Sequence, residues 1–151
     1  MTKRIVVLGA GISGVGAAIL AKRHGFDVFI SDKGNITDKN KQILLKNEIE
    51  WEEGEHTSDK ILNAHEVIKS PGISDKMELI QRLNLQSISV ISEVEFAFRY
   101  TKAKIAAITG SNGKTTTALL LGHILKKAGY DVLVAGNIGV GFAFSCRCTS
   151  Y

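Results

Sequence analysis

The chain has 151 residues, of which 44% are hydrophobic and 23% charged, a composition typical of globular domains. Its formal net charge is +4, but lysine and arginine are scattered, which argues against a nucleic-acid interface. No run approaches the roughly 18 apolar residues of a membrane helix. The N-terminal residues 3–8 faintly resemble a secretion signal, but glycines at positions 9, 11 and 14 interrupt the apolar run. We therefore expect a cytoplasmic protein that acts on small molecules and not on membranes, with an oligomeric state that the sequence leaves open.

Short apolar runs alternate with amphipathic stretches over the first hundred residues, which is typical of a parallel sheet with crossover helices. The pattern predicts strands at 5–8, 28–30, 67–68 and 89–91, and helices at 13–24, 37–46, 76–85 and from the capping-box sequence at 92–95 to about 100. The charged stretch that contains Glu52, Glu53, Glu55 and His56 is predicted to be a loop. Residues 1–100 are thus expected to form an α/β domain with a Rossmann-like parallel sheet.

A second domain is expected to begin after a link at residues 101–104, so that 101–151 is the start of a P-loop α/β domain. Its predicted elements are strands at 105–109 and 132–135 and a helix at 117–128, with Leu120, Leu121, Ile124 and Leu125 on the buried side. One such unit leaves much of its helix face and a strand edge uncovered. We therefore expect the first domain to fold and the second part to be marginal.

The first motif that carries chemistry is Gly9-Ala10-Gly11-Ile12-Ser13-Gly14, which follows a strand and opens a helix. Glycines allow a sharp turn and a close approach to a diphosphate, and the helix N-terminus offers free N–H groups. Asp32, at the end of the second strand, is placed to accept hydrogen bonds from a nucleotide. Alone, the motif predicts a nucleotide site and usually NAD, so an NAD-type oxidoreductase, a non-catalytic nucleotide-binding module and a simple tight turn all stay open.

The second motif is Gly110-Ser111-Asn112-Gly113-Lys114-Thr115-Thr116, between a predicted strand and a predicted helix. Backbone amides of such a loop hold phosphates, the Lys114 ammonium reaches the β- and γ-phosphates, and the Thr115 hydroxyl is placed to bind Mg²⁺. The general P-loop has a further glycine where Ile108 stands, so the match is to a shorter variant. The motif predicts an ATP site.

Two further turns follow predicted strands, at Ser70-Pro71-Gly72-Ile73 and Gly136-Asn137-Ile138-Gly139. Each is an ordinary turn or a substrate contact when taken alone. His56 and His65 lack acid or cysteine partners at useful spacing and are expected to be exposed.

The order and spacing of the four motifs resemble the Mur ligase family over about residues 4–141. The glycine-rich start and Asn112 of the phosphate loop, together with Ser70-Pro71-Gly72-Ile73, resemble most closely the members that add D-glutamate. This resemblance implies a peptidoglycan-precursor ligase that uses ATP and Mg²⁺ to phosphorylate UDP-N-acetylmuramoyl-L-alanine. The amine of D-glutamate then attacks the acyl phosphate and forms an amide bond.

The resemblance also assigns roles to particular residues of this chain. The UDP-substrate site would comprise Gly9, Gly11, Ile12, Ser13, Gly14, Asp32, Ser70 and Gly72, with Asn137 reaching the muramoyl part. ATP would be held by Gly110, Ser111, Asn112, Gly113, Lys114, Thr115 and Thr116, with Lys114 and Thr115 as the catalytic groups and Thr115 as the Mg²⁺ ligand. The family has a basic or hydroxyl group just after the acid. The corresponding positions here are Lys33 and Gly34, and Gly34 cannot supply a side-chain contact.

The last residues depart from that pattern. The segment 142–151 has no clear period and no helix cap, and it is interpreted as a premature stop, for example after a change of reading frame. Cys146 and Cys148 are too close for an ordinary disulfide and predict reduced thiols. The family's other catalytic residues and its amino-acid-binding domain have no counterpart here, so no ligase activity is expected from this chain alone.

Overall fold

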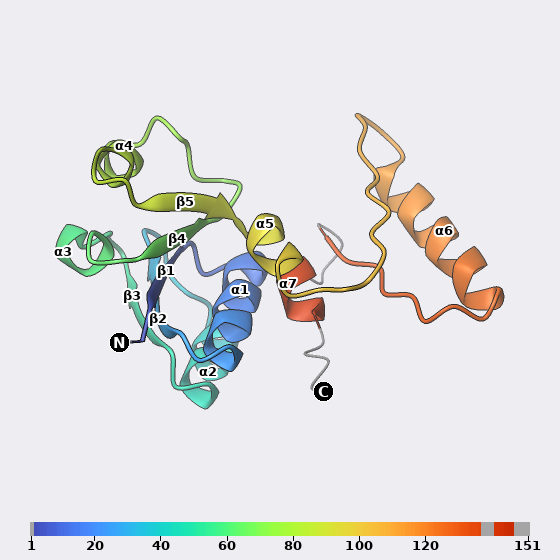
Figure 1. Ribbon diagram of the computed structural model, residues 1–151, viewed down its shortest axis with the longest axis horizontal. Helices are drawn as coiled ribbons and strands as arrows, with labels where there is room; N and C mark the ends of the chain where they lie inside the picture. Colours follow the sequence, from blue (N-terminus) through green and yellow to red (C-terminus); the bar gives the residue numbers. More distant parts are fainter. Residues whose placement is uncertain (1, 137–140, 147–151) are drawn as a thin grey trace.

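The computed structural model describes residues 2–136 and 141–146. Its centre is a five-stranded sheet of order β3-β2-β1-β4-β5, in which every neighbouring pair is parallel. The strands are β1 (Arg4–Leu8), β2 (Asp27–Asp32), β3 (Glu50–Glu53), β4 (Glu66–Lys69) and β5 (Ser89–Ser92). The α/β class and the parallel sheet predicted from the sequence are confirmed (Figure 1).

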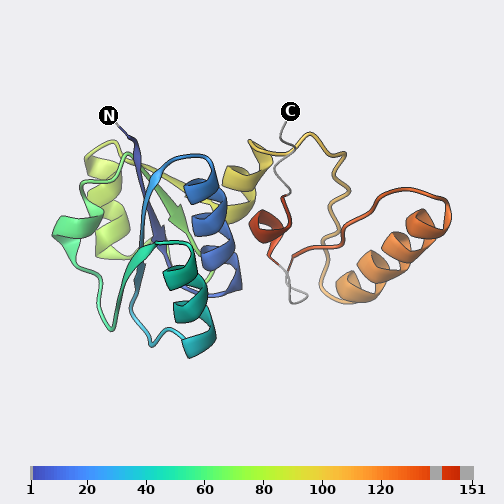
Figure 2. The ribbon, with the colours of Figure 1, turned by 90° about the horizontal axis from the view of Figure 1, so that it is seen from below.

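Helices cover both faces of this sheet, as Figures 1 and 2 show. One face carries α1 (Ile12–Arg23), α2 (Asp38–Lys46) and α5 (Glu93–Phe98), and the other carries α3 (Ser58–Ile61) and α4 (Glu78–Leu85). Strand β1 is buried on both faces, because Ile5 and Val7 pack in the first layer while Val6 and Leu8 pack in the second. Burial on both faces explains why the strand is a continuous apolar run.

Local capping agrees with the sequence pattern. Ser92 accepts a hydrogen bond from the Glu95 backbone N–H at 3.1 Å, and Thr37 accepts one from Asn40 at 3.3 Å. Gly25, predicted to end the first helix, has a φ of +79° directly after the C-cap residue. The four helices predicted within residues 1–100 therefore begin and end within about two residues of their predicted bounds, the usual spread of such boundaries.

The charged stretch predicted as a loop is partly a strand. Glu50–Glu53 forms β3, which pairs in parallel with β2 through Ser31 opposite Glu52. Only one end of the predicted loop remains, and α3 follows it. The prediction was wrong because an edge strand is defined by its pairing with a neighbour, and four residues with three carboxylates give no apolar alternation.

The segment 101–136 contains α6 (Lys114–Lys127), which lies apart from the sheet in both views. The strands predicted at 105–109 and 132–135 belong to no sheet in the described part of the chain. Leu120 and Ile124, predicted to be buried, are 58% and 53% exposed. These local predictions were wrong, because a strand needs a paired neighbour and an apolar helix face needs a covering layer.

The chain then returns to the first domain. The short helix α7 (Phe142–Ser145) packs on α1 and α5, and Ala143 and Cys146 join the core beside α1. Gly16 of α1 permits this contact, because a Cβ there would lie 2.9 Å from the Phe144 backbone nitrogen. No helix was predicted at these residues, because the segment has no clear apolar period and no helix cap. Within the described residues, no helix has the length and apolar character needed to cross a membrane.

Candidate nucleotide-binding sites

The first glycine-rich loop forms a tight corner between β1 and α1. Gly9 has a φ of +94°, and a Cβ there would lie 2.5 Å from the Ser70 hydroxyl. A Cβ on Gly14 would lie 1.8 Å from the Gly9 carbonyl oxygen. Both positions therefore require glycine for packing, whatever the loop binds.

Gly11 differs from Gly9 and Gly14, because a Cβ there would meet nothing within 4 Å. It is the N-cap residue of α1 and supplies no side-chain hydrogen bond to the first turn. Next to it, the Ile12 side chain is 56% exposed, and Ser13 is half-buried. In the described part of the chain, no side chain caps the first turn of α1, and an anion there would meet the positive end of the helix dipole.

Asp32 ties the end of β2 to this corner. Its carboxylate accepts the Ala10 N–H at 2.6 Å and the Gly34 N–H at 2.8 Å, one with each oxygen. Asn40 donates to the Ala10 carbonyl at 2.8 Å and closes the same loop from α2. The carboxylate predicted to meet a nucleotide therefore also fixes the glycine-rich loop, and each oxygen keeps one further lone pair for a ligand.

The turn after β4 lies against the same corner. The Ser70 N–H donates to the Leu8 carbonyl at 3.0 Å, and the Ile73 N–H donates to the Ser70 carbonyl at 3.1 Å. Lys69 holds the turn by donating to the Ile73 carbonyl at 2.7 Å and pairing with Asp75 at 3.0 Å. Gly72 is exposed on this turn.

The structure therefore brings together the predicted UDP-site residues from the carboxyl ends of three adjacent strands. They are Gly9, Gly11, Ile12, Ser13, Gly14, Asp32, Ser70 and Gly72. A crevice at the carboxyl ends of parallel strands is where doubly wound folds bind ligands. Asn137, the remaining predicted residue, lies outside the described residues.

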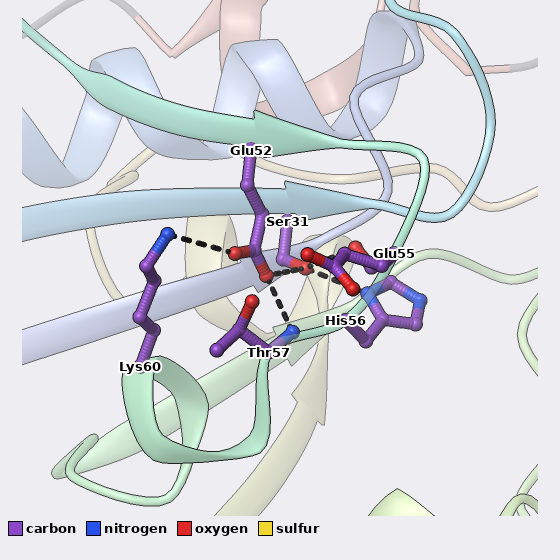
Figure 3. Close-up of polar contacts among 6 residues, drawn as sticks. All are labelled: Ser31, Glu52, Glu55, His56, Thr57 and Lys60. Atoms are coloured by element: carbon purple, nitrogen blue, oxygen red, sulfur yellow. Dashed lines mark hydrogen bonds and ion pairs between the residues drawn. The ribbon is translucent and has the colours of Figure 1, made fainter.

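A polar network beside this corner was missed by the sequence analysis (Figure 3). The fully buried Ser31 hydroxyl lies 2.7 Å from Glu52 Oε1 and 2.6 Å from His56 Nδ1. Glu52 also accepts the Thr57 N–H at 2.8 Å and pairs with Lys60 at 3.2 Å. Burial alone would raise the pKa of Glu52, but these donors outweigh it and hold the pKa below its usual value.

His56 is half-buried, so the prediction that it is exposed was wrong; its hydrogen-bond partner is Ser31, and no acid contacts the imidazole among the described contacts. Burial lowers the pKa of its imidazole, although the charges of Asp32 and Glu52 act in the opposite direction. The partners come from β2 and β3, so spacing along the chain could not reveal them. The available signal was the pairing of β2 with β3, which follows once Glu50–Glu53 is recognised as a strand.

The second glycine-bearing loop has the local geometry of a phosphate loop. Gly113 has a φ of +76° and precedes α6, which begins at Lys114 without a side-chain cap. The Lys114 ammonium folds over the loop and donates to the carbonyls of Gly110 and Ser111. The Lys114 ammonium and the backbone amides of Lys114, Thr115 and Thr116 fit a polyphosphate. Its oxygens would take the place of the two carbonyls as hydrogen-bond acceptors for Lys114.

A magnesium site would need ligands besides the Thr115 hydroxyl. Within residues 2–136 and 141–146, no group of three or more His, Cys, Asp or Glu side chains is placed to hold a metal. One hydroxyl beside bound phosphate oxygens fits Mg²⁺, which takes few protein ligands when it is held by a nucleotide. The loop thus fits Mg²⁺ only as part of a metal–nucleotide complex.

Two family models of known proteins match this chain. Residues 4–79 match the model of the MurD N-terminal domain, and residues 108–148 match that of the Mur ligase middle domain. The chain belongs to the Mur ligase family. The middle-domain match includes residues 142–148, so the interpretation that the family pattern stops at residue 141 was wrong.

Among its relatives is the UDP-N-acetylmuramoylalanine–D-glutamate ligase of Bacteroides fragilis, 60% identical over 141 residues that make up 93% of this chain. The protein of that name from Christiangramia forsetii is 52% identical over 95% of this chain. The chain spans 32% of the length of each of these relatives. The solved structure of the murein peptide ligase of Psychrobacter arcticus is also similar, with a TM-score of 0.62 at 25% sequence identity. The similar region covers 84% of this chain and 27% of the Psychrobacter chain.

Proposed function

We propose that this chain supplies the UDP-substrate-binding domain and the ATP phosphate loop of a cytoplasmic UDP-N-acetylmuramoyl-L-alanine:D-glutamate ligase. The observation that carries the proposal is the corner of Gly9, Gly11 and Asp32. It combines a backbone that only glycine permits with helix amides left open to an anion. The relatives named for this reaction at 52% and 60% identity support the choice of substrate.

Each site would hold one anionic substrate. The diphosphate of the UDP-sugar would lie at the N-terminus of α1, with its nucleoside toward Asp32 and the Ser70–Gly72 turn. The Gly110–Thr116 loop would hold ATP, with Lys114 beside the β- and γ-phosphates. Bound Mg²⁺ would neutralise charge that develops on the transferred phosphoryl group. The proposal therefore gives this chain binding and electrostatic roles and leaves amide formation to the whole ligase.

An NAD-type oxidoreductase would use the same kind of glycine-rich corner between β1 and α1. That alternative leaves the Gly110–Thr116 loop without a role, and nothing in the described residues favours it over the ligase. The third alternative, a nucleotide-binding module without catalysis, overlaps with the proposal for a chain that spans 32% of its relatives.

Calorimetry on the 151-residue chain tests the proposal with UDP, NAD and ATP as separate titrants. We expect UDP to bind and NAD not to bind, and Lys114→Ala to weaken ATP while leaving UDP unchanged. Lys104→Ala, at an exposed lysine of the preceding segment, is the matched control. A folded sample that ignores UDP, or that prefers NAD, would overturn the proposal. D-glutamate-dependent phosphate release by this chain would contradict the division of roles.

A further inference from the structure

The network of Ser31, Glu52 and His56 has a serine, a histidine and a carboxylate in contact, as hydrolase triads have. The order of contacts is different, however. Here the serine lies in the middle, fully buried, and the carboxylate contacts the serine and not the imidazole in the described contacts. A nucleophile must be exposed and must lose its proton to the histidine. The geometry therefore excludes a nucleophilic role for Ser31 and leaves open what the imidazole does.

The protons in the network can be assigned from the chemistry of each partner. Ser31 has one O–H, and its neighbours are the Glu52 carboxylate at 2.7 Å, the Glu55 carbonyl at 3.3 Å and His56 Nδ1 at 2.6 Å. An ionised carboxylate can only accept, so the hydroxyl donates to Glu52. His56 must then bring its own proton to the short contact, and Nδ1–H donates to Ser31 Oγ.

That assignment fixes the other end of the imidazole. A neutral ring with a proton on Nδ1 carries a lone pair on Nε2. Figure 3 shows the ring turning its second nitrogen away from Ser31 and Glu52. Among the contacts of the described residues, none occupies Nε2. His56 thus presents one oriented acceptor.

The acceptor lies at the nucleotide corner. The Ser31 carbonyl, on the residue that anchors the imidazole, accepts the Gly9 N–H of the glycine-rich loop at 2.8 Å. Asp32, the next residue, is close enough to influence the charge of His56. Strand β3 delivers His56 to the same carboxyl edge of the sheet through its pairing with β2.

We propose that His56 is a further nucleotide-binding residue, held by Ser31 so that Nε2 accepts a hydrogen bond from the nucleoside of the UDP substrate. This inference rests on the proposed function and deepens it. Two donors of uridine have the required chemistry, the N3–H of the base and a ribose hydroxyl. A cytosine base has an acceptor at N3, so acceptance from the base would also favour uridine over cytidine.

Two substitutions at one position separate the anchor from the acceptor. His56→Asn places an amide N–H near the position of Nδ1 and removes Nε2, whereas His56→Gln reaches the position of Nε2. Calorimetry of the 151-residue chain with UDP-N-acetylglucosamine should show about a tenfold higher Kd for His56→Asn, equivalent to about 1.4 kcal/mol. His56→Gln should recover part of that loss.

The control is His65→Asn. His65 also accepts a hydrogen bond through Nδ1, from the Arg4 N–H at 3.0 Å, but it lies before β4 at the opposite edge of the sheet. It should leave the Kd unchanged, and thermal melts should show that each variant is folded. Kd values of UDP, CDP and 2′-deoxy-UDP at pH 8 then identify the donor. If N3–H donates, His56→Asn abolishes the preference for UDP over CDP. If the 2′-hydroxyl donates, the same substitution abolishes the preference for UDP over 2′-deoxy-UDP.

Acidification gives an independent readout. The charged groups around His56 are Asp32 at the end of β2, Lys33 directly after it, Glu52 on β3, Glu55 in the loop and Lys60 on α3. Protonation of His56 removes the lone pair, so binding of UDP-N-acetylglucosamine should weaken below the pKa of His56, and this step should be absent in His56→Asn.

The outcomes separate the inference from the function on which it rests. If the wild-type chain does not bind UDP-N-acetylglucosamine, the proposed function fails. If the wild-type chain binds and folded His56→Asn binds equally well, only the role of His56 is refuted. Tighter binding on acidification that depends on His56 would show that Nε2 donates to phosphate, and it would overturn the acceptor role.

Discussion

Two regions of this chain begin with the same local pattern and reach different degrees of burial. In the first, a strand, a glycine-rich loop and α1 are buried among neighbours, and every residue from Gly14 to Ala21 is buried. In the second, the glycine-bearing loop leads into α6, where Gly122 is the one buried residue among those the structure describes. The difference lies in what surrounds each unit and not in the motif.

Local and non-local interactions have different outcomes in the second region. The positive φ of Gly113 and the helix that starts at Lys114 arise from neighbouring residues, and both form without a sheet. The strands expected on either side of α6 need hydrogen-bonding partners from distant sequence, and neither pairs in the part of the chain that the structure describes. The loop geometry at Gly113 is thus specified locally, whereas α6 has little burial to support it.

Hydrogen exchange should show the largest difference between the two regions. Amides of β1 exchange only through unfolding of the whole domain, whereas those of α6 exchange through local opening. We expect exchange in β1 to be slower by on the order of a thousandfold or more, given ordinary domain stabilities. Mass spectrometry of the deuterated chain measures both. Equal protection of α6 and β1 would show that the second region is covered after all.

A pair of leucine truncations should sharpen the same comparison. Leu83 on α4 is fully buried, and Leu120 on α6 is 58% exposed. Leu83→Ala should lower the free energy of unfolding by about 2–5 kcal/mol, because it leaves a cavity in a packed layer. Leu120→Ala should change it by less than about 0.5 kcal/mol, as surface substitutions do.

Urea denaturation followed by circular dichroism compares the two variants under one set of conditions. A large loss from Leu120→Ala would mean that the face of α6 is covered in solution. A small loss from Leu83→Ala would mean that the layer of α3 and α4 is loosely packed.

The elements that could be predicted are those specified by residues close together in sequence. The apolar run of β1, the cap at Ser92 and the stop at Gly25 each follow from a few adjacent residues, and each is found where it was expected. The glycine-rich corner was also predicted, because glycine at 9 and 14 has a steric reason that the motif itself encodes. Most of the residues predicted to form the UDP site belong to this loop, and they lie together for that reason.

The elements that were missed depend on pairing between distant residues. Strand β3 has three glutamates and forms because β2 lies beside it. The contact of His56 with Ser31 follows from that pairing and could not be predicted without it. The second role of Asp32, as an acceptor for loop amides, depends on the turn of the glycine-rich loop toward β2.

Helix α7 follows the second region in sequence but packs with the first region. Its Ala143 N–H donates to the Glu93 carboxylate at 2.5 Å, and Glu93 is 6% exposed at the start of α5. Burial raises the pKa of Glu93, although the hydrogen bond from Ala143 acts in the opposite direction. One backbone donor offsets only part of the free-energy cost of removing a carboxylate from water.

The smallest predicted effect is therefore a gain in stability from Glu93→Gln. A raised pKa means that the contribution of the neutral acid to stability is complete below the unfolded value of 4.5 and is lost as the pH rises through the folded pKa. The amide can still accept from Ala143 and has no charge to bury. We expect Glu93→Gln to unfold like the wild type at pH 4 and to be more stable by on the order of 1 kcal/mol at pH 7.

The control for this gain is Glu95→Gln, which removes a 57%-exposed carboxylate from the same first turn of α5. It loses the favourable interaction with the helix dipole without any relief of burial, so it should be neutral or slightly destabilising at pH 7. Thermal melts of both variants from pH 4 to pH 8 measure the difference. If Glu93→Gln shows no gain that grows with pH, then Glu93 is solvated, and α7 is not docked on the first domain as the structure has it.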